Sequence, residues 1–368
     1  MRFGWLTLGH SPSPEEDFKA IREQLDQAMH AEAVGFDSVW LTEHNFTGES
    51  VYSDPIPFAS ALAMRTSRVR IGFAVIQMAL RHPVRLATEL ALLDNLCEGR
   101  LDVGVGRGTI FNEYEFVGYG LRSSDSRERL DEGLEILLRA FSGEAVEFKG
   151  RHFEVSFPEL RPRPVQRPHP PVWHSAVAPA SFEACGRKGV PLMTVRLAIP
   201  QLKERLALYE KGLAQSGLPE ARQAELRDSA AVWRHVYVAD SDAQAEDELS
   251  AALLVGRHHM NHARETFNPS DFVVDEALLN PWANTKVGDE EALRFLLANG
   301  VLYGTRDRVR GQLEELRDAG VGHVLCQMSF GYMAHENIMA SMSAFGEVMP
   351  TFRAPRDRSV KAAAALAH

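Results

Sequence analysis

The chain has 368 residues, of which 45% are hydrophobic and 24% are charged, and its formal net charge is −10 at pH 7. This acidic balance argues against a protein that wraps nucleic acid or coats an anionic membrane, because binding to phosphate backbones depends on clustered cations. No apolar run reaches the roughly 18 residues that a transmembrane helix needs, and residues 1–17 lack the apolar core of a signal peptide. We therefore expect a soluble, cytoplasmic protein that contacts neither nucleic acid nor membrane.

Short apolar runs alternate with amphipathic stretches along the chain. The candidate strands are residues 3–8, 38–42, 69–76, 101–105, 171–175, 192–195, 233–238 and 324–328. The candidate helices include residues 15–34, 84–96, 127–141, 182–188, 201–215, 243–263 and 305–319. Strands that alternate with helices are typical of βα units and of a parallel sheet. The pattern therefore predicts an α/β fold, which is either an open doubly wound sheet or a closed (β/α)8 TIM barrel.

Three segments interrupt this alternation. Residues 144–171 contain VEFKGRHFEVSF, which predicts a β-hairpin inserted after the fourth βα unit, and then a proline-rich connector. Residues 265–290 are polar and irregular; long segments of this kind are usually functional or disordered, so we predict a mobile lid loop. From residue 354 onward the chain is basic and then alanine-rich, as in a loose terminus. The prediction is one domain over 1–353 and a flexible tail over 354–368.

The positions of polar residues distinguish the two architectures. An open Rossmann sheet would carry GxGxxG in its first βα turn, but residues 9–12 read GHSP. Polar residues follow successive strands, namely His44 after the second, Gln77 after the third and Arg107 after the fourth, and Ser175 ends the fifth. In a barrel these positions share the C-terminal rim, where barrel active sites are built, whereas in an open sheet they would lie along an edge. The sequence therefore favours the barrel, with a candidate site at its rim.

Three residues near this rim suggest chemistry. His44 titrates near neutral pH and can serve as acid or base, although a histidine bonded to the backbone is an equally good interpretation. Arg107 lies between two glycines and offers a planar set of donors to an anion; the alternative is an ion pair with a carboxylate such as Glu113. Ser181 opens a helix, where free N–H groups attract phosphate, unless it is an ordinary N-cap.

The remaining motifs are weak. The three cysteines lie far apart and form no CxxC motif, which argues against a zinc knuckle or a redox pair. Residues 258–262 read HHMNH, which places two histidines one helical turn apart, but the glutamate of the metalloprotease motif HExxH is absent. We therefore predict no metal site.

An ordered set of motifs makes this chain resemble the bacterial luciferase-like, flavin-dependent monooxygenases. The motifs are VWLTEHNF at 39–46, RVRIGFAVIQMALRHPVRLATE at 68–89, LDNLCEGRLDVGVGRG at 93–108, NEYEFVG at 112–118 and GTRDRVRGQLEELRDAGVGHV at 304–324. The resemblance implies a (β/α)8 barrel, commonly a homodimer, that binds FMN at its C-terminal rim. It also implies a two-component monooxygenase, in which a separate flavin reductase supplies FMNH2 and a flavin C4a-peroxide formed with O2 oxygenates a small organic substrate.

The resemblance also assigns roles to residues. His44 matches the catalytic histidine, and residues 265–290 match a loop that closes over the active site in relatives. The flavin-binding positions match Ala74 and Val75 beneath the ring, Gly106, Arg107 at the phosphate, Thr109, and Val177, Ala178 and Ser181 at the phosphate loop. In relatives the segment that matches 74–75 can carry a non-prolyl cis peptide bond. Luciferase itself has His-His in place of His44-Asn45 and a reactive cysteine in place of Gly106, which argues against light emission.

The substrate is the least defined part of this prediction. The candidate contacts are Asn45, Met78, Tyr114 and Trp282, together with Trp5 and Trp173, and they suggest a partly apolar pocket. Two other functions stay open. One is hydride transfer with the deazaflavin F420, although such relatives usually have Asp-His where this chain has Glu43-His44. The other is flavin binding without catalysis, which we would expect to accompany the loss of His44 and of the lid.

Overall fold

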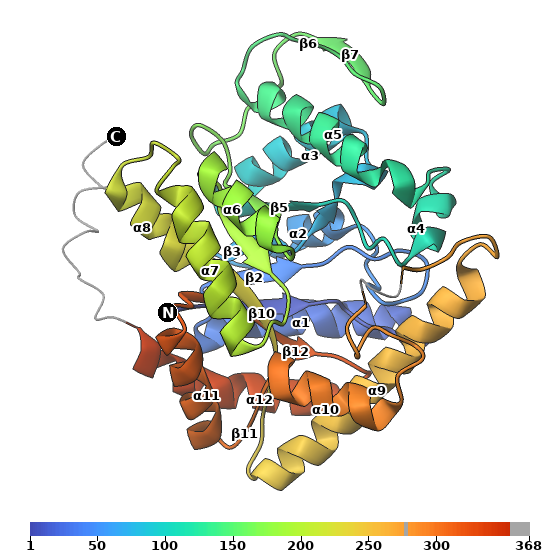
Figure 1. Ribbon diagram of the computed structural model, residues 1–368, viewed down its shortest axis with the longest axis vertical. Helices are drawn as coiled ribbons and strands as arrows, with labels where there is room; N and C mark the ends of the chain where they lie inside the picture. The colour runs from blue at the N-terminus through green and yellow to red at the C-terminus, as the bar shows by residue number, and fades with distance from the viewer. Residues whose placement is uncertain (276–278, 354–368) are drawn as a thin grey trace.

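A closed barrel of eight parallel strands forms the centre of the molecule (Figure 1), and the computed structural model describes residues 1–275 and 279–353 of the chain. In order around the barrel, the strands are β1 (Arg2–Thr7), β2 (Ser38–Leu41), β3 (Arg70–Phe73), β5 (Leu101–Gly106), β8 (Val172–Ser175), β9 (Leu192–Thr194), β10 (Ala231–Val238) and β12 (His323–Ser329). The sheet closes on itself because β9 pairs with β10, β10 with β12 and β12 with β1. The predicted TIM barrel is confirmed, and the open-sheet alternative is wrong.

Two further short strands extend this sheet. β4 (Ile76–Gln77) pairs with the end of β5 and follows a cis peptide bond between Ala74 and Val75. β11 (Val301–Gly304) pairs with the second half of β10. β11 was not among the predicted strands, because its four buried residues follow the last turn of a helix directly and have no pattern of their own.

Helices cover the outside of the barrel (Figure 1). They are α1 (Asp17–Val34), α2 (Pro55–Ala63), α3 (Pro83–Leu96), α4 (Glu113–Gly118), α5 (Ser126–Phe141), α6 (Pro179–Lys188), α7 (Ile199–Leu213), α8 (Glu220–Ser229), α9 (Asp242–Phe267), α10 (Asp289–Gly300), α11 (Arg306–Asp318) and α12 (His335–Val348). The predicted hairpin is confirmed as the antiparallel pair β6 (Val146–Lys149) and β7 (Glu154–Phe157), which lies beside α5 at one end of the molecule. None of the helices in the described part of the chain is long and apolar enough to cross a membrane.

The segment predicted as a lid begins as helix and continues as a loop that is hydrogen-bonded to α9. The long helix α9 continues into its first residues, and the remainder is a loop that leads to α10. The Arg257 guanidinium of α9 donates hydrogen bonds to three backbone carbonyls of this loop, at Trp282, Asn284 and Val287. Residues 276–278 of the predicted lid, and the predicted tail over 354–368, lie outside the described residues.

The inside of the barrel is filled by aromatic and apolar side chains. Trp40 is fully buried between Gly4 and Gly72, where an added Cβ atom would lie 2.6 Å and 2.4 Å from the indole ring. Glycine at both positions therefore makes room for the tryptophan. Val75 and Trp233 pack on this interior cluster but are only partly buried, so they form part of the floor of the barrel mouth.

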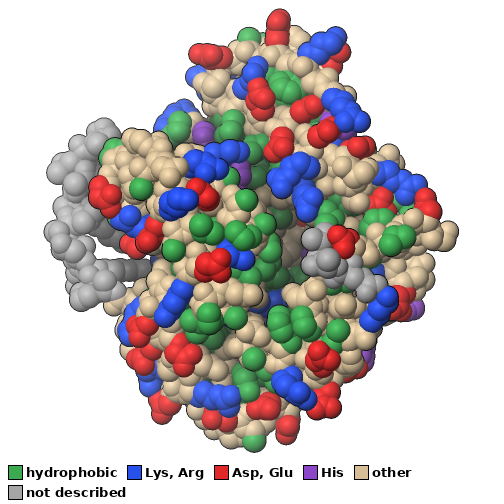
Figure 2. Space-filling model, viewed as in Figure 1, with side chains coloured by type: hydrophobic (Ala, Val, Ile, Leu, Met, Phe, Trp, Pro, Cys, Tyr) green, Lys and Arg blue, Asp and Glu red, His purple; other side chains and the backbone are tan. Residues whose placement is uncertain are grey.

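The surface carries a mixture of charges. Figure 2 shows Lys and Arg side chains interspersed with Asp and Glu over the face that it presents. The formal charge of −10 is therefore not gathered into one acidic field on this face.

Candidate functional site

The C-terminal rim of the barrel brings the predicted flavin-site residues to neighbouring strand ends. Strand register places Gln77 beside Gly106 and Val105 beside His174 of the next strand. The segments that follow β2, β4, β5 and β8 consequently leave the barrel side by side, as the sequence predicted. His44 follows β2, at the start of this row.

A buried carboxylate, that of Glu115 in α4, organises the surroundings of His44. The Glu115 side chain is fully buried, and one of its oxygens lies 3.2 Å from His44 Nδ1. It also accepts hydrogen bonds from three neighbouring residues, namely from Asn45 through its N–H (3.2 Å) and its side-chain amide (3.3 Å), from Gln77 Nε2 (2.6 Å) and from Asn112 Nδ2 (2.7 Å). The other ring nitrogen, His44 Nε2, lies 3.7 Å from a Glu49 oxygen. His44 is thus held between two carboxylates.

This arrangement favours the protonated form of His44. Burial by itself lowers the pKa of this histidine, but the carboxylates of Glu49 and Glu115 outweigh burial and raise its pKa from 6.5 to about 9. Burial would raise the pKa of Glu115, yet the His44 cation and the hydrogen-bond donors hold the pKa of that carboxyl below its usual range. At neutral pH the pair is an imidazolium and a carboxylate, so the His44 ring carries a proton that it can donate.

Glu43, the residue before His44, has a structural role. Its carboxylate accepts hydrogen bonds from the Gln77 backbone N–H (2.8 Å) and from Arg81 (2.7 Å), and Arg81 also contacts Asp54 at 2.9 Å. Burial raises the pKa of Glu43, although the Arg81 cation opposes that shift. These contacts tie the loop after β2 to the loop after β4, so Glu43 positions its neighbour.

Arg107, on the next part of the rim, lacks a partner of opposite charge. Over residues 1–275 and 279–353 the structure gives its guanidinium no hydrogen bond and no ion pair. The predicted alternative, an ion pair with Glu113, is wrong, because Glu113 contacts Arg122 at 3.6 Å. Burial and the nearby Arg127 cation lower the pKa of Arg107. A half-buried cation beside a second cation is electrostatically suited to an anion.

Helix α6 begins after β8, the strand next to that of Arg107. Ala178 occupies its N-cap position and, like Val177, is exposed. The Ser181 hydroxyl donates to the Ala178 carbonyl at 3.0 Å, so the alternative in which Ser181 is the N-cap is wrong. The first turn of α6 has no side-chain cap. Pro179 has no N–H and the Ser181 N–H donates to the Ala178 carbonyl at 3.0 Å, so the Ala180 N–H is the group of this turn that can meet a phosphate.

At the predicted binding position of the flavin ring, the backbone of β5 approaches the side chain of Val75 closely. The peptide bond between Ala74 and Val75 is cis. A Cβ atom added at Gly106 would lie 2.5 Å from Val75 Cγ2, so glycine is needed for β5 to approach this side chain. Thr109 lies beyond β5, and its carbonyl accepts a hydrogen bond from the Asn112 N–H at 2.9 Å.

Two of the predicted substrate contacts surround the His44 cluster. Asn45 is buried; its amide donates to Glu115 at 3.3 Å and accepts a hydrogen bond from the Tyr119 hydroxyl at 2.9 Å. Tyr114 packs edge-on against Phe267 of α9, with 6.3 Å between ring centroids. Asn45 is therefore occupied by neighbouring side chains, whereas Tyr114 joins α4 to α9.

The other predicted contacts lie apart from these. Met78 is fully buried against Gly133 of α5 and lines neither of the cavities described below. Trp5 and Trp173 are also buried, in the hydrophobic core. Of this set, Trp282 lines one of the two cavities described below.

That cavity, which we call the mouth cavity, opens above β1, β9, β10 and β12. Its walls include Leu8, Glu49, Arg196, Trp233, Trp282 and Phe330. Glu49 joins it to the His44 cluster, because the same carboxylate that lines the cavity lies 3.7 Å from His44 Nε2. The sequence analysis missed Glu49 and Arg196. Arg196 could have been found, since it follows the sixth predicted strand as Arg107 follows the fourth.

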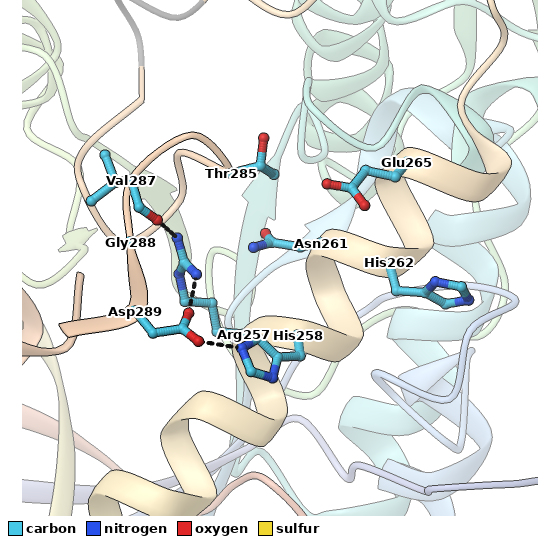
Figure 3. Close-up of a pocket in the computed structure, with 9 residues that line it drawn as sticks. All are labelled: Arg257, His258, Asn261, His262, Glu265, Thr285, Val287, Gly288 and Asp289. Carbon is cyan, nitrogen blue, oxygen red and sulfur yellow. Dashed lines mark hydrogen bonds and ion pairs between the residues drawn. The ribbon is translucent and has the colours of Figure 1, made fainter. Parts of the chain in front are cut away.

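A second and more open groove lies between α9 and the loop that precedes α10 (Figure 3). His258 Nε2 contacts Asp289 at 2.7 Å, and Figure 3 shows His262 pointing away from them. His259 contacts the Tyr332 hydroxyl at 2.7 Å. The three histidines of the HHMNH motif therefore do not converge on one point, and the groove lacks a connection to His44 of the kind that Glu49 provides.

Comparisons with known proteins identify the family to which the chain is similar. Residues 1–323 match the sequence model of a family described as luciferase-like monooxygenase. The chain is 26% identical, over 362 residues and 96% of each chain, to the oxygenase component of a flavin-dependent trigonelline monooxygenase from Acinetobacter baylyi. It is also 26% identical, over 366 residues, to an F420-dependent glucose-6-phosphate dehydrogenase from Amycolatopsis mediterranei, covering 95% of this chain and 99% of that one. The crystal structure of monooxygenase RslO1 from Streptomyces bottropensis superposes with a TM-score of 0.77 at 29% identity, covering 96% of this chain and 100% of that chain.

Proposed function

Because this chain belongs to the luciferase-like monooxygenase family, we propose that it is the oxygenase component of a two-component flavin monooxygenase. A separate reductase supplies FMNH2, and the chain uses it with O2 to oxygenate a small organic substrate. A trigonelline monooxygenase relative is named as an oxygenase component, which supports this division of labour. We also propose that the chain acts as a homodimer in the cytoplasm.

The observation that carries this proposal is the unpaired Arg107 beside the uncapped start of α6. A phosphate at this position would receive hydrogen bonds from a planar guanidinium and from the Ala180 N–H, which has no partner within the helix. The other predicted flavin contacts, Val75 and Gly106, lie on the same rim, at the floor of the mouth. These residues fit FMN, whose single phosphate and planar ring require one anion site and one flat apolar seat.

Reduced FMN, when bound, supplies the electrons with which O2 is activated. The protein's own part is to bind, to position and to donate a proton. Arg107 and Ser181 hold the phosphate end, and Ala74 and Val75 support the ring. The His44 imidazolium, fixed by Glu115, donates a proton from the rim at neutral pH. Trp282, held over the mouth cavity through Arg257, helps to keep water from the reacting atoms.

The proposal is tested by mixing the protein with photoreduced FMN under anaerobic conditions and then adding 18O2 and a pool of candidate substrates. We expect mass spectrometry to detect a product that carries one labelled oxygen atom and depends on both FMNH2 and the protein. FMN that binds, with no labelled product from any pool, would instead favour a flavin-binding protein without oxygenase activity.

The runner-up is F420-dependent hydride transfer, which the similarity to an F420-dependent dehydrogenase supports. The Glu43-His44 sequence argued for FMN, and the structure gives Glu43 a positioning role. Titration of the protein with FMN, FMNH2 and F420, followed by absorbance and fluorescence, separates the two functions. Tighter binding of F420 than of FMNH2 by tenfold or more would reverse our preference.

A further inference from the structure

The mouth cavity contains one positive charge that no acidic side chain balances. Arg196, which follows β9, places its guanidinium 4.0 Å from the centre of the Trp233 ring. Its one hydrogen-bond contact within the described residues is with His235 Nε2, a neutral imidazole nitrogen. Burial, with the Arg234 cation adding to it, lowers the pKa of Arg196 to about 9. The guanidinium is thus enclosed, still cationic at neutral pH, and short of acceptors.

The other ionisable residues that line this cavity are neutral or already paired. Burial lowers the pKa of His10 to about 4 and that of His235 well below its ordinary value, so both rings are uncharged. Glu49 and Glu115 together are balanced by two cations, His44 and Arg264. Arg257 is balanced by Asp289 at 2.5 Å. The charge of Arg196 is therefore the one left over.

The rest of the cavity is apolar and partly aromatic. Leu8, Leu253, Met260, Trp282 and Phe330 contribute to its walls. Trp233 packs on the same interior cluster as Ala74 and Val75, the residues of the proposed flavin seat. An apolar enclosure with a single strong donor group is typical of a site that binds an organic molecule and fixes its orientation by one polar end.

We propose that the mouth cavity binds the substrate, and that this substrate is a carboxylic acid with an apolar or aromatic body whose carboxylate pairs with Arg196. The proposal rests on the proposed oxygenase function and narrows its substrate class. Arg196 offers a planar pair of donors that matches a carboxylate. With the acid group held there, the apolar body extends over Trp233 towards the flavin seat and towards Glu49 and His44. Arg196 is then a specificity-determining residue, separate from the phosphate site at Arg107.

The test uses protein loaded with FMN and three pairs of probes, each an acid and its amide: benzoate and benzamide, phenylacetate and phenylacetamide, octanoate and octanamide. Binding is followed by the change in flavin absorbance and by calorimetry. We expect at least one acid to bind about tenfold or more tightly than its amide, because a charge-assisted hydrogen bond to a buried arginine discriminates at that level. Arg196→Met should abolish the preference and Arg196→Lys should retain part of it. Arg187→Met, at an exposed arginine of α6, is the matched control and should change nothing.

Affinities for FMN and riboflavin, measured on the same samples, separate the possible failures. If Arg196→Met weakens FMN but not riboflavin, Arg196 serves the flavin phosphate and the inference is wrong. If FMN binds normally to every variant and no acid is preferred over its amide, the cavity is not a carboxylate site. If wild-type protein binds no flavin, the proposed function fails first, which the flavin titration shows directly.

Discussion

The two sides of the barrel mouth differ in whether their charged side chains have partners of opposite charge. On the side of β2 and α4, His44 lies between the carboxylates of Glu49 and Glu115. On the side of β5 and β9, Arg107 and Arg196 have no carboxylate partner in the part of the chain that the structure describes. On the first side the protein's own charges compensate one another, whereas the second side leaves positive charge that a bound anion could neutralise.

This difference separates residues that position their neighbours from residues that bind a ligand. Removing one member of a buried, saturated pair leaves an unpaired charge and lowers the stability of the fold. An unpaired cation contributes little to the stability of the free protein, and its replacement should lower ligand affinity instead. Mutations on the side of His44 should therefore lower stability, whereas mutations of Arg107 or Arg196 should lower ligand affinity.

The largest effect on stability is expected for Glu115→Ala. This carboxylate is fully buried and accepts hydrogen bonds from three neighbouring residues besides its contact with His44. Its loss should lower the free energy of unfolding by about 3–5 kcal/mol, as for other broken buried pairs. Urea unfolding followed by circular dichroism measures the change. Glu128→Ala, at an exposed carboxylate that contacts Arg151, is the control and should be close to wild type. Equal losses of stability in the two variants would contradict a stabilising role for the hydrogen bonds to Glu115.

Arg107→Met should produce the opposite pattern. Its affinity for FMN should fall about ten- to a hundredfold, because a charge-assisted contact with the phosphate is lost. Its affinity for riboflavin, which has no phosphate, should not change. The free energy of unfolding should stay the same or rise, since a cation beside Arg127 is removed. Arg122→Met, which removes an arginine paired with Glu113, is the control for flavin affinity. Equal losses of FMN and riboflavin binding would show that Arg107 does not contact the phosphate.

The His44 cluster also predicts a pH dependence of stability. The pKa of His44 rises from 6.5 in the unfolded chain to about 9 in the folded protein, so folding favours the protonated ring. The resulting stabilisation is fully present below pH 6.5 and is lost as the pH rises through about 9. We expect the difference in unfolding free energy between wild type and His44→Gln to shrink by about 1–3 kcal/mol across this window. A difference that is constant with pH would show that His44 is not protonated by its neighbours.

The sequence predicted the barrel and much of the rim because both follow from local pattern and topology. Buried runs such as that around Trp40 define strands, and the ends of parallel strands in a barrel meet on one side. The sequence therefore predicts that His44 and Arg107 lie on this rim, and the structure places them at the ends of β2 and β5. Chain order could not reveal the partners of His44, since Glu49 lies in the loop after β2 and Glu115 in the short helix α4.

Other predictions were wrong where one sequence pattern is compatible with two positions of a side chain in the fold. Met78 follows a strand, but an apolar side chain at a strand end can point into the mouth or into the layer of helices, and here it packs on α5. Ser181 is of a residue type that N-caps favour, yet the N-cap of α6 is Ala178 and the helix begins at Pro179. The excess charge of Arg196 can be recognised only when every neighbour and its protonation state are counted together.

The smallest effect is expected in the groove beside α9, where an ion pair is exposed. His258 contacts Asp289 at 2.7 Å, with 59% of the histidine and 41% of the aspartate side chain exposed. Exposed pairs contribute less than about 1 kcal/mol, so His258→Ala should leave both the unfolding free energy and the affinity for FMN close to wild type. The HHMNH motif gives this variant a second use. A zinc site would make added Zn2+ stabilise wild type more than His258→Ala, whereas the separated histidines predict the same melting temperature for both proteins with and without Zn2+. A zinc-dependent difference would move functional interest from the mouth of the barrel to this groove.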